Sequence, residues 1–201
     1  MAGKPKPSKQ PKSSEQTRPS KRDAILDAML DLVVERGFHD APMSLLSQRS
    51  GASAGVIYHY FPSKDDLIRA LYLRVKSIKM QSLLEGYVPG MSPHDTFIHL
   101  WTNAYRFYRE HLRETRFLDQ YENSPFACDA PQMVEEDNVR IEFQKQFRSR
   151  KTGGILNDLP PEVVYELSFG LASRLAKKSK PLSRASLKQV AETVWTAITD
   201  K

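Results

Sequence analysis

The sequence is poor in cysteine and in long apolar runs, and each shortage excludes a class of protein. A single cysteine, Cys128, cannot form a disulfide within the chain, so a disulfide scaffold is excluded and a reducing compartment fits. We expect this thiol to be structural. No run approaches the roughly 20 apolar residues that a membrane span needs, and the N-terminus lacks the apolar segment of a secretory signal. The sequence predicts a cytoplasmic protein without a membrane partner.

Motifs for catalysis and for metal binding are missing as well. There is no glycine-rich phosphate loop and no nucleophile elbow. Acidic pairs at residues 65–66 and 135–136 are typical of solvated helix faces. The histidines show no metal-ligand spacing with acids or with the cysteine; they are His39, His59, His94, His99 and His111. We therefore expect no catalytic residue, no metal site and no cofactor, and we do not expect an enzyme.

The positive charge is concentrated at the N-terminus. The net charge is +6, and residues 1–22 hold seven basic side chains against one acidic side chain, so the other 179 residues are balanced. Residues 1–19 combine Lys, Pro and Ser almost without apolar side chains, which predicts a disordered basic tail. Such a tail can add a salt-sensitive contact to DNA phosphates, or it can be a solubilising leader.

Three short helical patterns and one longer pattern follow the tail. Ser20 fits a helix N-cap, and apolar residues at helical spacing predict a helix over 20–36, ended by a left-handed glycine at Gly37. The stretches 43–50 and 53–61 read as two short helices joined at Gly51, which is the pattern of a helix-turn-helix. A longer helix begins after Ser63 and runs to about residue 84.

The segment from Ser50 to Leu67, SGASAGVIYHYFPSKDDL, resembles the signature of TetR-family bacterial transcriptional regulators. The resemblance extends back through Gly37 and Phe38, so it covers about 48 residues, from 20 to 67. It implies an N-terminal three-helix DNA-binding domain followed by a helical dimerisation and ligand-binding domain. Pro42 departs from the pattern where a threonine is usual, which removes one expected phosphate contact.

The resemblance also implies roles for individual residues. Tyr58 and Lys64 would hold DNA phosphates, and Ser44 would touch the backbone. The major groove would be faced by Ser53, Ala54, Gly55, Val56 and His59. This face is small and apolar, so we expect specificity to depend on methyl contacts, DNA shape and the imidazole of His59. The alternative for Tyr58 and Tyr60 is that they pack the small head.

Beyond residue 75 the helical period continues without a nameable motif. We expect helices over about 94–112, from 117 to the turn at Pro125, over 131–150, and over the two patterns 160–178 and 183–198, which would form a hairpin. The prediction is an all-α protein in three parts: a tail at 1–19, a DNA-binding domain at 20–75, and an effector-binding and dimerisation domain at 76–201.

By resemblance, the terminal hairpin would pair with a second copy as a four-helix bundle and form a homodimer. The interface candidates are Leu167, Leu171, Val190, Val194 and Ile198. Packing within one chain is the alternative for the same residues, because periodicity alone cannot separate the two. A homodimer would place two heads on successive major grooves of a palindromic DNA site.

An effector pocket for a small molecule is a further implication of the resemblance. The candidate lining residues are aromatic: Trp101, Tyr105, Tyr121, Phe126, Phe143, Tyr165 and Phe169. Ordinary core packing is the alternative for each. We expect a repressor that a small-molecule effector releases from its operator. The alternative is an architectural or cell-division DNA-binding factor that acts through a protein partner.

Overall fold

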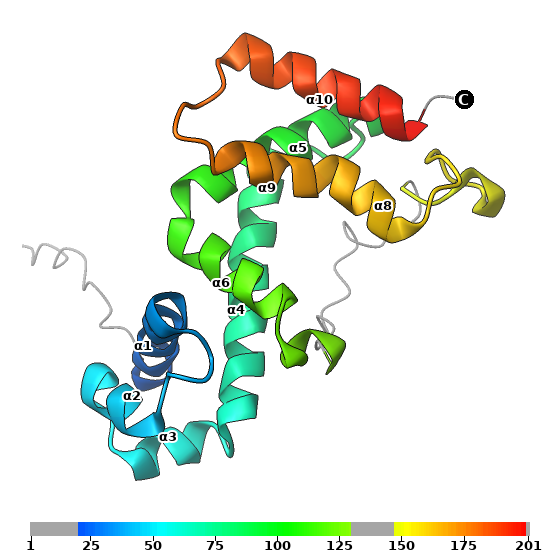
Figure 1. The fold of residues 1–201 in the computed structure, drawn as a ribbon. Helices are drawn as coiled ribbons and strands as arrows, with labels where there is room; N and C mark the ends of the chain where they lie inside the picture. Colours follow the sequence, from blue (N-terminus) through cyan, green and yellow to red (C-terminus); the bar gives the residue numbers. More distant parts are fainter. Residues whose placement is uncertain (1–19, 130–146, 200–201) are drawn as a thin grey trace, which may run out of the picture.

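The computed structural model describes residues 20–129 and 147–199, and in these ranges the regular secondary structure is helical (Figure 1). The all-α prediction is confirmed. The elements are α1 (Lys21–Arg36), α2 (Met43–Ser50), α3 (Ala54–Tyr60), α4 (Lys64–Leu84), α5 (Pro93–Glu110), α6 (Leu112–Glu122), η1 (Pro125–Asp129), η2 (Arg150–Thr152), α8 (Pro161–Tyr165), η3 (Glu166–Gly170), α9 (Leu171–Ala176) and α10 (Arg184–Thr199).

Helices α1–α3 and the first turns of α4 form the N-terminal head. Serines cap these helices as the sequence predicts: the Ser20 hydroxyl accepts from the Asp23 amide at 3.1 Å, and the Ser63 hydroxyl accepts from the Asp66 amide at 3.0 Å. The core of the head is fully buried and apolar, and it includes Ile25, Met29, Leu46, Ile57 and Leu67. Burial of this apolar surface stabilises the head by about 25 cal/mol per Å² and holds the short helices together.

Two glycines shape the connections in the head. Gly51 has φ 66° and ψ 14°, so it forms the left-handed turn between α2 and α3 that the sequence predicts. Gly37 ends α1 with φ 82° but ψ 174°. The positive φ was expected, but the left-handed helical cap was not found, because the chain leaves α1 in an extended direction.

Helix α4 connects the head to the rest of the molecule (Figure 1). It ends at Leu84 as predicted, and the expected domain boundary at residue 75 falls inside this continuous helix. Asn103 of α5 supplies the C-terminal cap, since its amide donates to the carbonyls of Leu83 and Glu85 at 2.9 and 3.0 Å. The head and the second domain therefore share an element rather than a flexible linker.

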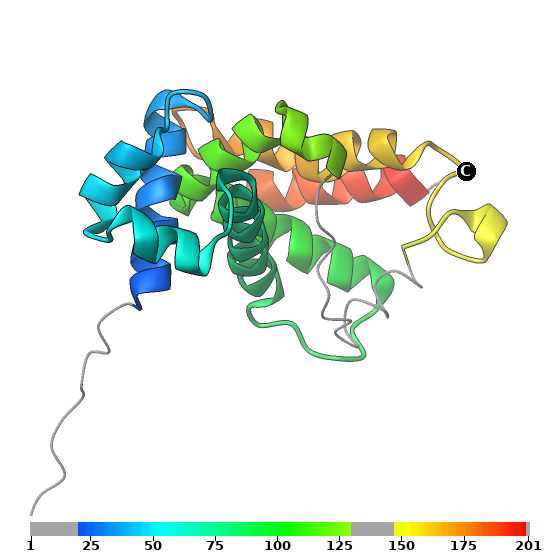
Figure 2. The same cartoon turned by 90° about the horizontal axis from the view of Figure 1, so that it is seen from below.

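The second domain is a layer built on α5, with α9 and α10 packed against it (Figure 2). Trp101, Phe107, Ala172 and Ala191 are buried in its core. Arg109 of α5 caps the end of α9 by donating to the Ala176 carbonyl at 3.0 Å. The helical pattern at 160–178 is interrupted by the π-helical turn η3, which the sequence does not predict.

The end of one expected helix and the expected place of the cysteine differ from the structure of this half. The helix expected over 131–150 does not include residues 147–149, which form bends and a bridge from Ser149 to Leu156; Val139 and Phe143 lie outside the described residues. Cys128, expected to be structural, is exposed as a free thiol. Within 20–129 and 147–199, no helix is long and apolar enough to cross a membrane.

Candidate DNA-binding face and effector cavity

The residues that the resemblance assigns to DNA contact lie on one exposed part of the head. Ser53 caps α3, because its hydroxyl accepts from the Val56 amide at 3.4 Å. Ile57 faces the core, whereas Tyr58 is 48% exposed and Tyr60 is 41% exposed, so neither tyrosine packs fully into the head. Ser44, Ala54, Gly55 and His59 are also exposed, and Val56 is half-buried. The outer face of α3 is therefore free for a ligand.

Two serines strengthen the turn that presents this face. The Ser47 hydroxyl donates to the Ala52 carbonyl at 2.7 Å, and the Ser50 hydroxyl donates to the Leu46 carbonyl at 2.7 Å. Each part-buried hydroxyl thereby has a hydrogen-bond partner.

Lys64 has a partner inside the head. Its Nζ donates to the Phe38 carbonyl at 2.6 Å, which ties the start of α4 to the loop after α1. The resemblance implies a DNA phosphate as the partner of Lys64, and in the free protein a backbone carbonyl is one partner of its ammonium. An ammonium has three donors, and two remain for a phosphate.

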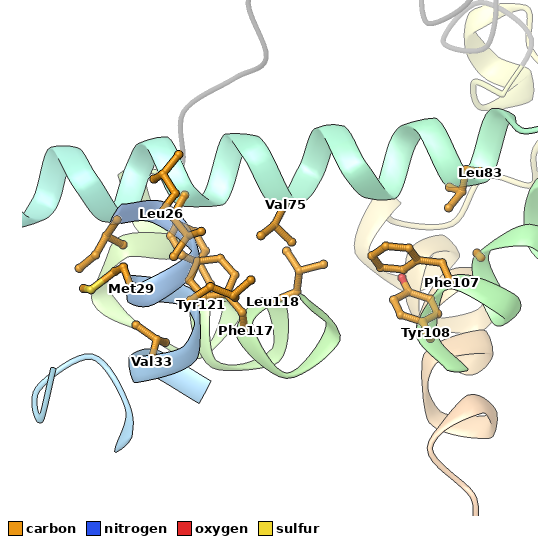
Figure 3. Packing of buried hydrophobic residues seen from close by; sticks show 14 of the residues in the cluster. Leu26, Met29, Val33, Val75, Leu83, Phe107, Tyr108, Phe117, Leu118 and Tyr121 are labelled. Carbon is orange, nitrogen blue, oxygen red and sulfur yellow. The ribbon is translucent and has the colours of Figure 1, made fainter. Parts of the chain in front are cut away.

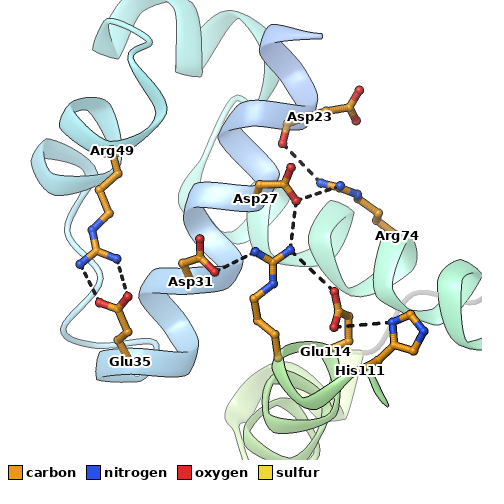
Figure 4. A network of polar contacts seen from close by, with 9 residues as sticks. Asp23, Asp27, Asp31, Glu35, Arg49, Arg74, His111 and Glu114 are labelled. Carbon is orange, nitrogen blue, oxygen red and sulfur yellow. Dashed lines mark hydrogen bonds and ion pairs between the residues drawn. The ribbon is translucent and has the colours of Figure 1, made fainter. Parts of the chain in front are cut away.

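Asp27, Asp31 and Glu35 lie at four-residue spacing along α1, and the side chain of each contacts a basic side chain from another element (Figure 4). Glu35 forms a two-bond ion pair with Arg49 of α2, with distances of 2.6 and 2.8 Å. Asp27 pairs with Arg74 of α4 at 2.9 Å. Like charges at this spacing repel on an isolated helix. The basic partners offset that repulsion and fix α1 against its neighbours.

Arg113 brings the second domain into this network. Its guanidinium, on α6, lies 2.9 Å from Asp31 and 3.5 Å from Asp27, both on α1. Apolar packing supports the same contact: Phe117 and Tyr121 of α6 are buried against α1 and α4 (Figure 3). Helix α6 thus contacts the head through both ion pairs and apolar packing.

The aromatic candidates for the effector pocket do not line one common pocket in the structure. Trp101 and Tyr105 are buried in the second-domain core, where the Trp101 indole donates to the Ser168 carbonyl at 3.0 Å. Phe169 packs near Phe97 there, with ring centroids 6.5 Å apart. Trp101, Tyr105 and Phe169 therefore belong to the core, which was the alternative to a role in lining the pocket.

Two more candidates lie where α6 meets the head. Tyr121 stacks on Tyr72 with ring centroids 4.0 Å apart, and Phe126 lies 5.2 Å from the Phe38 ring. Of the described candidates, Tyr165 alone lines the cavity described next.

A cavity of about 220 Å³ lies between α4, α6 and the α8–η3–α9 segment. Lys79 of α4 and Tyr108 of α5 lie on one side of it, and Leu118, Asp119 and Glu122 of α6 on another. The remaining lining comes from around the π-helical turn and α9, and it includes Tyr165, Glu166, Gly170, Arg174 and Lys177. The cavity is polar and charged rather than aromatic.

The electrostatics of this cavity differ from those of the surface. Burial lowers the pKa of Lys79 to about 8, because an ammonium loses hydration there. Burial also raises the pKa of Glu122, and it raises the pKa of Tyr165 to about 12. Tyr108 has a raised pKa, again chiefly through burial. Perturbed groups gathered at one cavity are typical of functional sites.

Sequence reasoning missed most of these residues. Lys79, Asp119 and Glu122 resemble solvated positions of amphipathic helices, so the sequence gives no signal that they meet. The π-helical turn holds Glu166 and Gly170 at the cavity, and a Cβ added to Gly170 would lie 2.8 Å from the Glu166 carboxylate. The small glycine at this position could have drawn attention to a close approach.

The dimer candidates divide between the core and the surface. Val194 and Ile198 are buried in this chain, at 4% and 1% exposure, so packing within one subunit describes them. Leu167 is exposed, and Leu171 and Val190 are half-buried. Val163 is also exposed, one helical turn before Leu167, and was not among the candidates.

Comparisons with known proteins agree with this architecture. The family described as "Bacterial regulatory proteins, tetR family" matches residues 25–71. The family described as "Tetracyclin repressor-like, C-terminal domain" matches residues 94–199, more than half of the 201-residue chain. The two matches together cover the head and the second domain.

Individual proteins that are similar to this chain are also transcriptional regulators. An uncharacterized HTH-type transcriptional regulator from Haemophilus influenzae is 27% identical over 88% of this chain and 94% of that protein. The crystal structure of a TetR-family transcriptional regulator from H. influenzae has a TM-score of 0.69 at 27% identity, covering 90% of this chain and 97% of that one. A regulator from Marinobacter aquaeolei shares the fold, with a TM-score of 0.74, 18% identity, and coverage of 90% and 96%.

A shorter match involves the transcriptional regulator BetI of Klebsiella pneumoniae. It is 42% identical over 53 residues, which are 26% of this chain and 27% of that protein. The exposed face of α3, the fold of the second domain and the two family matches lead to one conclusion: the chain belongs to the TetR family and is a DNA-binding transcriptional regulator with a helix-turn-helix head.

Proposed function

We propose that this regulator is a homodimeric repressor that leaves a palindromic operator when a small molecule occupies the cavity. The DNA-binding domain is 20–75, the effector-binding and dimerisation domain is 76–201, and the protein acts in the cytoplasm, where the nucleoid lies. The DNA contacts are those inferred from the resemblance: Ser44, Ser53, Ala54, Gly55, Val56, Tyr58, His59 and Lys64. The exposure of the α3 face supports this assignment.

The observation that carries the proposal is the double role of α6. Leu118, Asp119 and Glu122 of this helix line the cavity, and Arg113 at its start pairs with Asp27 and Asp31 of α1. A ligand that moves α6 would therefore also move the head. A close-packed core does not deform smoothly, so packed helices move between discrete positions. A shift of one helix is therefore transmitted to the helices packed against it.

Release of DNA requires that the ligand prefer one arrangement of the heads. A ligand shifts the equilibrium only by its difference in affinity for the two arrangements, and a tenfold difference supplies about 1.4 kcal/mol. The relevant geometry is the distance between two heads, which must be about 34 to 36 Å for successive major grooves. A small rotation of α6 in each subunit changes that distance.

Dimerisation through the α8–η3–α9 face and α10 would supply the second head. Val163 and Leu167 expose 38% and 42% of their surface, and they lie one turn apart on this segment. Two exposed apolar side chains on one helical face are typical of an interaction site. The substitution Leu167→Asp, with the exposed Leu112→Asp of α6 as a matched control, is expected to produce monomers in sedimentation analysis only at position 167.

The experiment that tests the effector model uses fragments rather than a guessed ligand. A fragment library is screened by thermal shift against the wild type and against Ser173→Leu, which fills the cavity. Fragments that stabilise only the wild type are then titrated into a complex with operator DNA and followed by fluorescence anisotropy. The proposal predicts release by such fragments, and unchanged operator affinity with the cavity occupied would contradict it.

A further inference from the structure

Among the described cations that line the cavity, Lys79 is the one without a salt bridge. Lys177 pairs with Asp119 at 2.7 Å, and Arg174 pairs with Glu166. These two pairs neutralise four of the six charged side chains that line the cavity. Lys79 and Glu122 remain.

These last two residues are not an ion pair. Glu122 is exposed at the edge of the cavity, and among the described residues Lys79 forms neither a salt bridge nor a hydrogen bond. The direct contact of the Lys79 ammonium is with the face of the Tyr108 ring, 4.9 Å from Nζ to the centroid. Glu122 and Asp119 attract the ammonium without a salt bridge. A cation–π contact offsets only part of the lost hydration of an ammonium. The site therefore has room for an anion in direct contact with Lys79.

Two tyrosine hydroxyls at the cavity can act as hydrogen-bond donors. Burial raises the pKa of both Tyr108 and Tyr165, so both phenols are protonated at neutral pH. A protonated phenol can donate to a bound oxygen. Figure 3 shows Tyr108 on the side of α5 that faces α4, the helix that carries Lys79.

We propose that the cavity binds a small organic monocarboxylate, whose carboxylate pairs with Lys79 and accepts a hydrogen bond from Tyr165. A dianion such as a phosphate monoester fits less well, because three carboxylates already line the cavity and one lysine can balance only one further charge. A cationic ligand would be repelled by Lys79. This proposal rests on the effector role proposed above, since it names the ligand class of the same site.

The size of the cavity limits the rest of the ligand. Its volume of about 220 Å³ lies below the roughly 300–1,000 Å³ that is common for drug-sized ligands. The Leu118 side chain and the two tyrosine rings provide the apolar surface for a short or single-ring body. Benzoate is therefore a suitable probe, with benzamide as its neutral isostere and benzylamine as its cationic counterpart.

The test measures the three probes by isothermal titration calorimetry with the full chain. Benzoate is expected to bind at least about tenfold more tightly than benzamide, a difference of one decade in Kd. The preference should disappear in Lys79→Met and persist in Lys76→Met, which removes a lysine one turn away on the same helix. Thermal melting establishes that both variants are folded.

The wild type also tests the proposal without a variant. Benzoate affinity should fall as pH rises through about 8, because Lys79 then loses its charge. The charged and titratable groups around Lys79 are Lys76 of α4, Tyr108 of α5, Asp119 and Glu122 of α6, Tyr165, Glu166, Arg174 and Lys177.

Several results would overturn the assignment. They are equal binding of benzoate and benzamide, a preference for benzylamine, a benzoate preference that survives in Lys79→Met, or no benzoate binding up to about 10 mM. Failure of the effector role is distinguishable, because it appears as benzoate binding with unchanged operator affinity. Conversely, release of DNA by a neutral fragment would keep the effector role and reject the carboxylate.

Discussion

The guanidinium of Arg113, on α6, lies 2.9 Å from the carboxylate of Asp31, on α1, and joins the helix that lines the cavity to the first helix of the head. Both side chains are about two-fifths exposed, so each ion pair contributes at most about 1 kcal/mol to stability. The functional importance of the pair therefore lies in position rather than in stability. It holds α6 and α1 at one relative orientation.

Substitution of Arg113 should loosen that contact selectively. In Arg113→Ala, hydrogen–deuterium exchange is expected to accelerate in both α1 and α6, with a loss of unfolding free energy of about 1 kcal/mol. Glu35→Gln is the matched control, because it breaks a pair with Arg49 inside the head and should leave α6 exchange unchanged. Unchanged exchange in both helices of Arg113→Ala would show that packing alone holds them.

Lys64 is expected to have two separable roles. Lys64→Ala removes the charged hydrogen bond to the Phe38 carbonyl and should lower unfolding free energy by roughly 1–2 kcal/mol in denaturant titrations. It should also reduce the salt dependence of DNA binding by about one phosphate contact. Arg69→Ala, which removes a cation of α4 with a weak 3.8 Å pair, is the stability control. If the salt dependence of DNA binding were the same in Lys64→Ala and in the wild type, the role of this lysine would be structural alone.

Two glycines near α3 should respond in opposite directions. Gly51 has φ 66° with open space around it, so Gly51→Ala incurs only the backbone penalty, about 1–2 kcal/mol of unfolding free energy. Gly55 lies within α3, also with open space, and Gly55→Ala should raise helix stability by up to about 1 kcal/mol. If Gly55 faces the major groove, the same substitution weakens operator binding. Calorimetric melting and anisotropy measure the two effects separately.

The pattern of local signals explains which parts of the head the sequence predicts well. Serine caps at positions 20, 53 and 63 and the left-handed glycine at position 51 act within a few residues, so the starts of α1, α3 and α4 and the end of α2 follow from local chemistry. The Phe38 carbonyl that binds Lys64 is 26 residues away in sequence. No local pattern contains such a partner.

The cavity is even harder to predict from local sequence patterns, because several distant segments form it. Lys79 lies on a helix whose sequence pattern is amphipathic, and its desolvation depends on α6 and the α8–η3–α9 segment folding over it. Val194 and Ile198 have the spacing of an interface, but their burial is decided by packing within one chain. Periodicity identifies a buried face without identifying what covers it.

The desolvated ammonium of Lys79 should reduce stability in a way that depends on pH. The folded-state pKa of Lys79, about 8, lies below its ordinary value of 10.5, so folding disfavours the protonated form. The resulting penalty is fully present below pH 8 and is relieved as pH rises from about 8 towards 10.5. Lys79→Met is therefore expected to be more stable than the wild type at neutral pH, by on the order of 2–3 kcal/mol.

The matched control for this prediction is Lys76→Met. Denaturant titrations at about pH 7 and about pH 10 should show that the advantage of Lys79→Met shrinks at the higher pH. Lys76→Met should show no comparable change between the two values. A constant difference for Lys79→Met would indicate that the ammonium is hydrated in the folded protein.

The measurement that tests the account most directly is selection of genomic DNA fragments by the purified protein at physiological salt. It is repeated without residues 1–19 and with His59→Ala, the variant that removes the main polar group of the α3 face. The account predicts one or a few palindromic sites that survive removal of the tail and are lost in His59→Ala. Salt-sensitive binding without a preferred site, or many dispersed sites, would contradict it and favour an architectural DNA-binding factor.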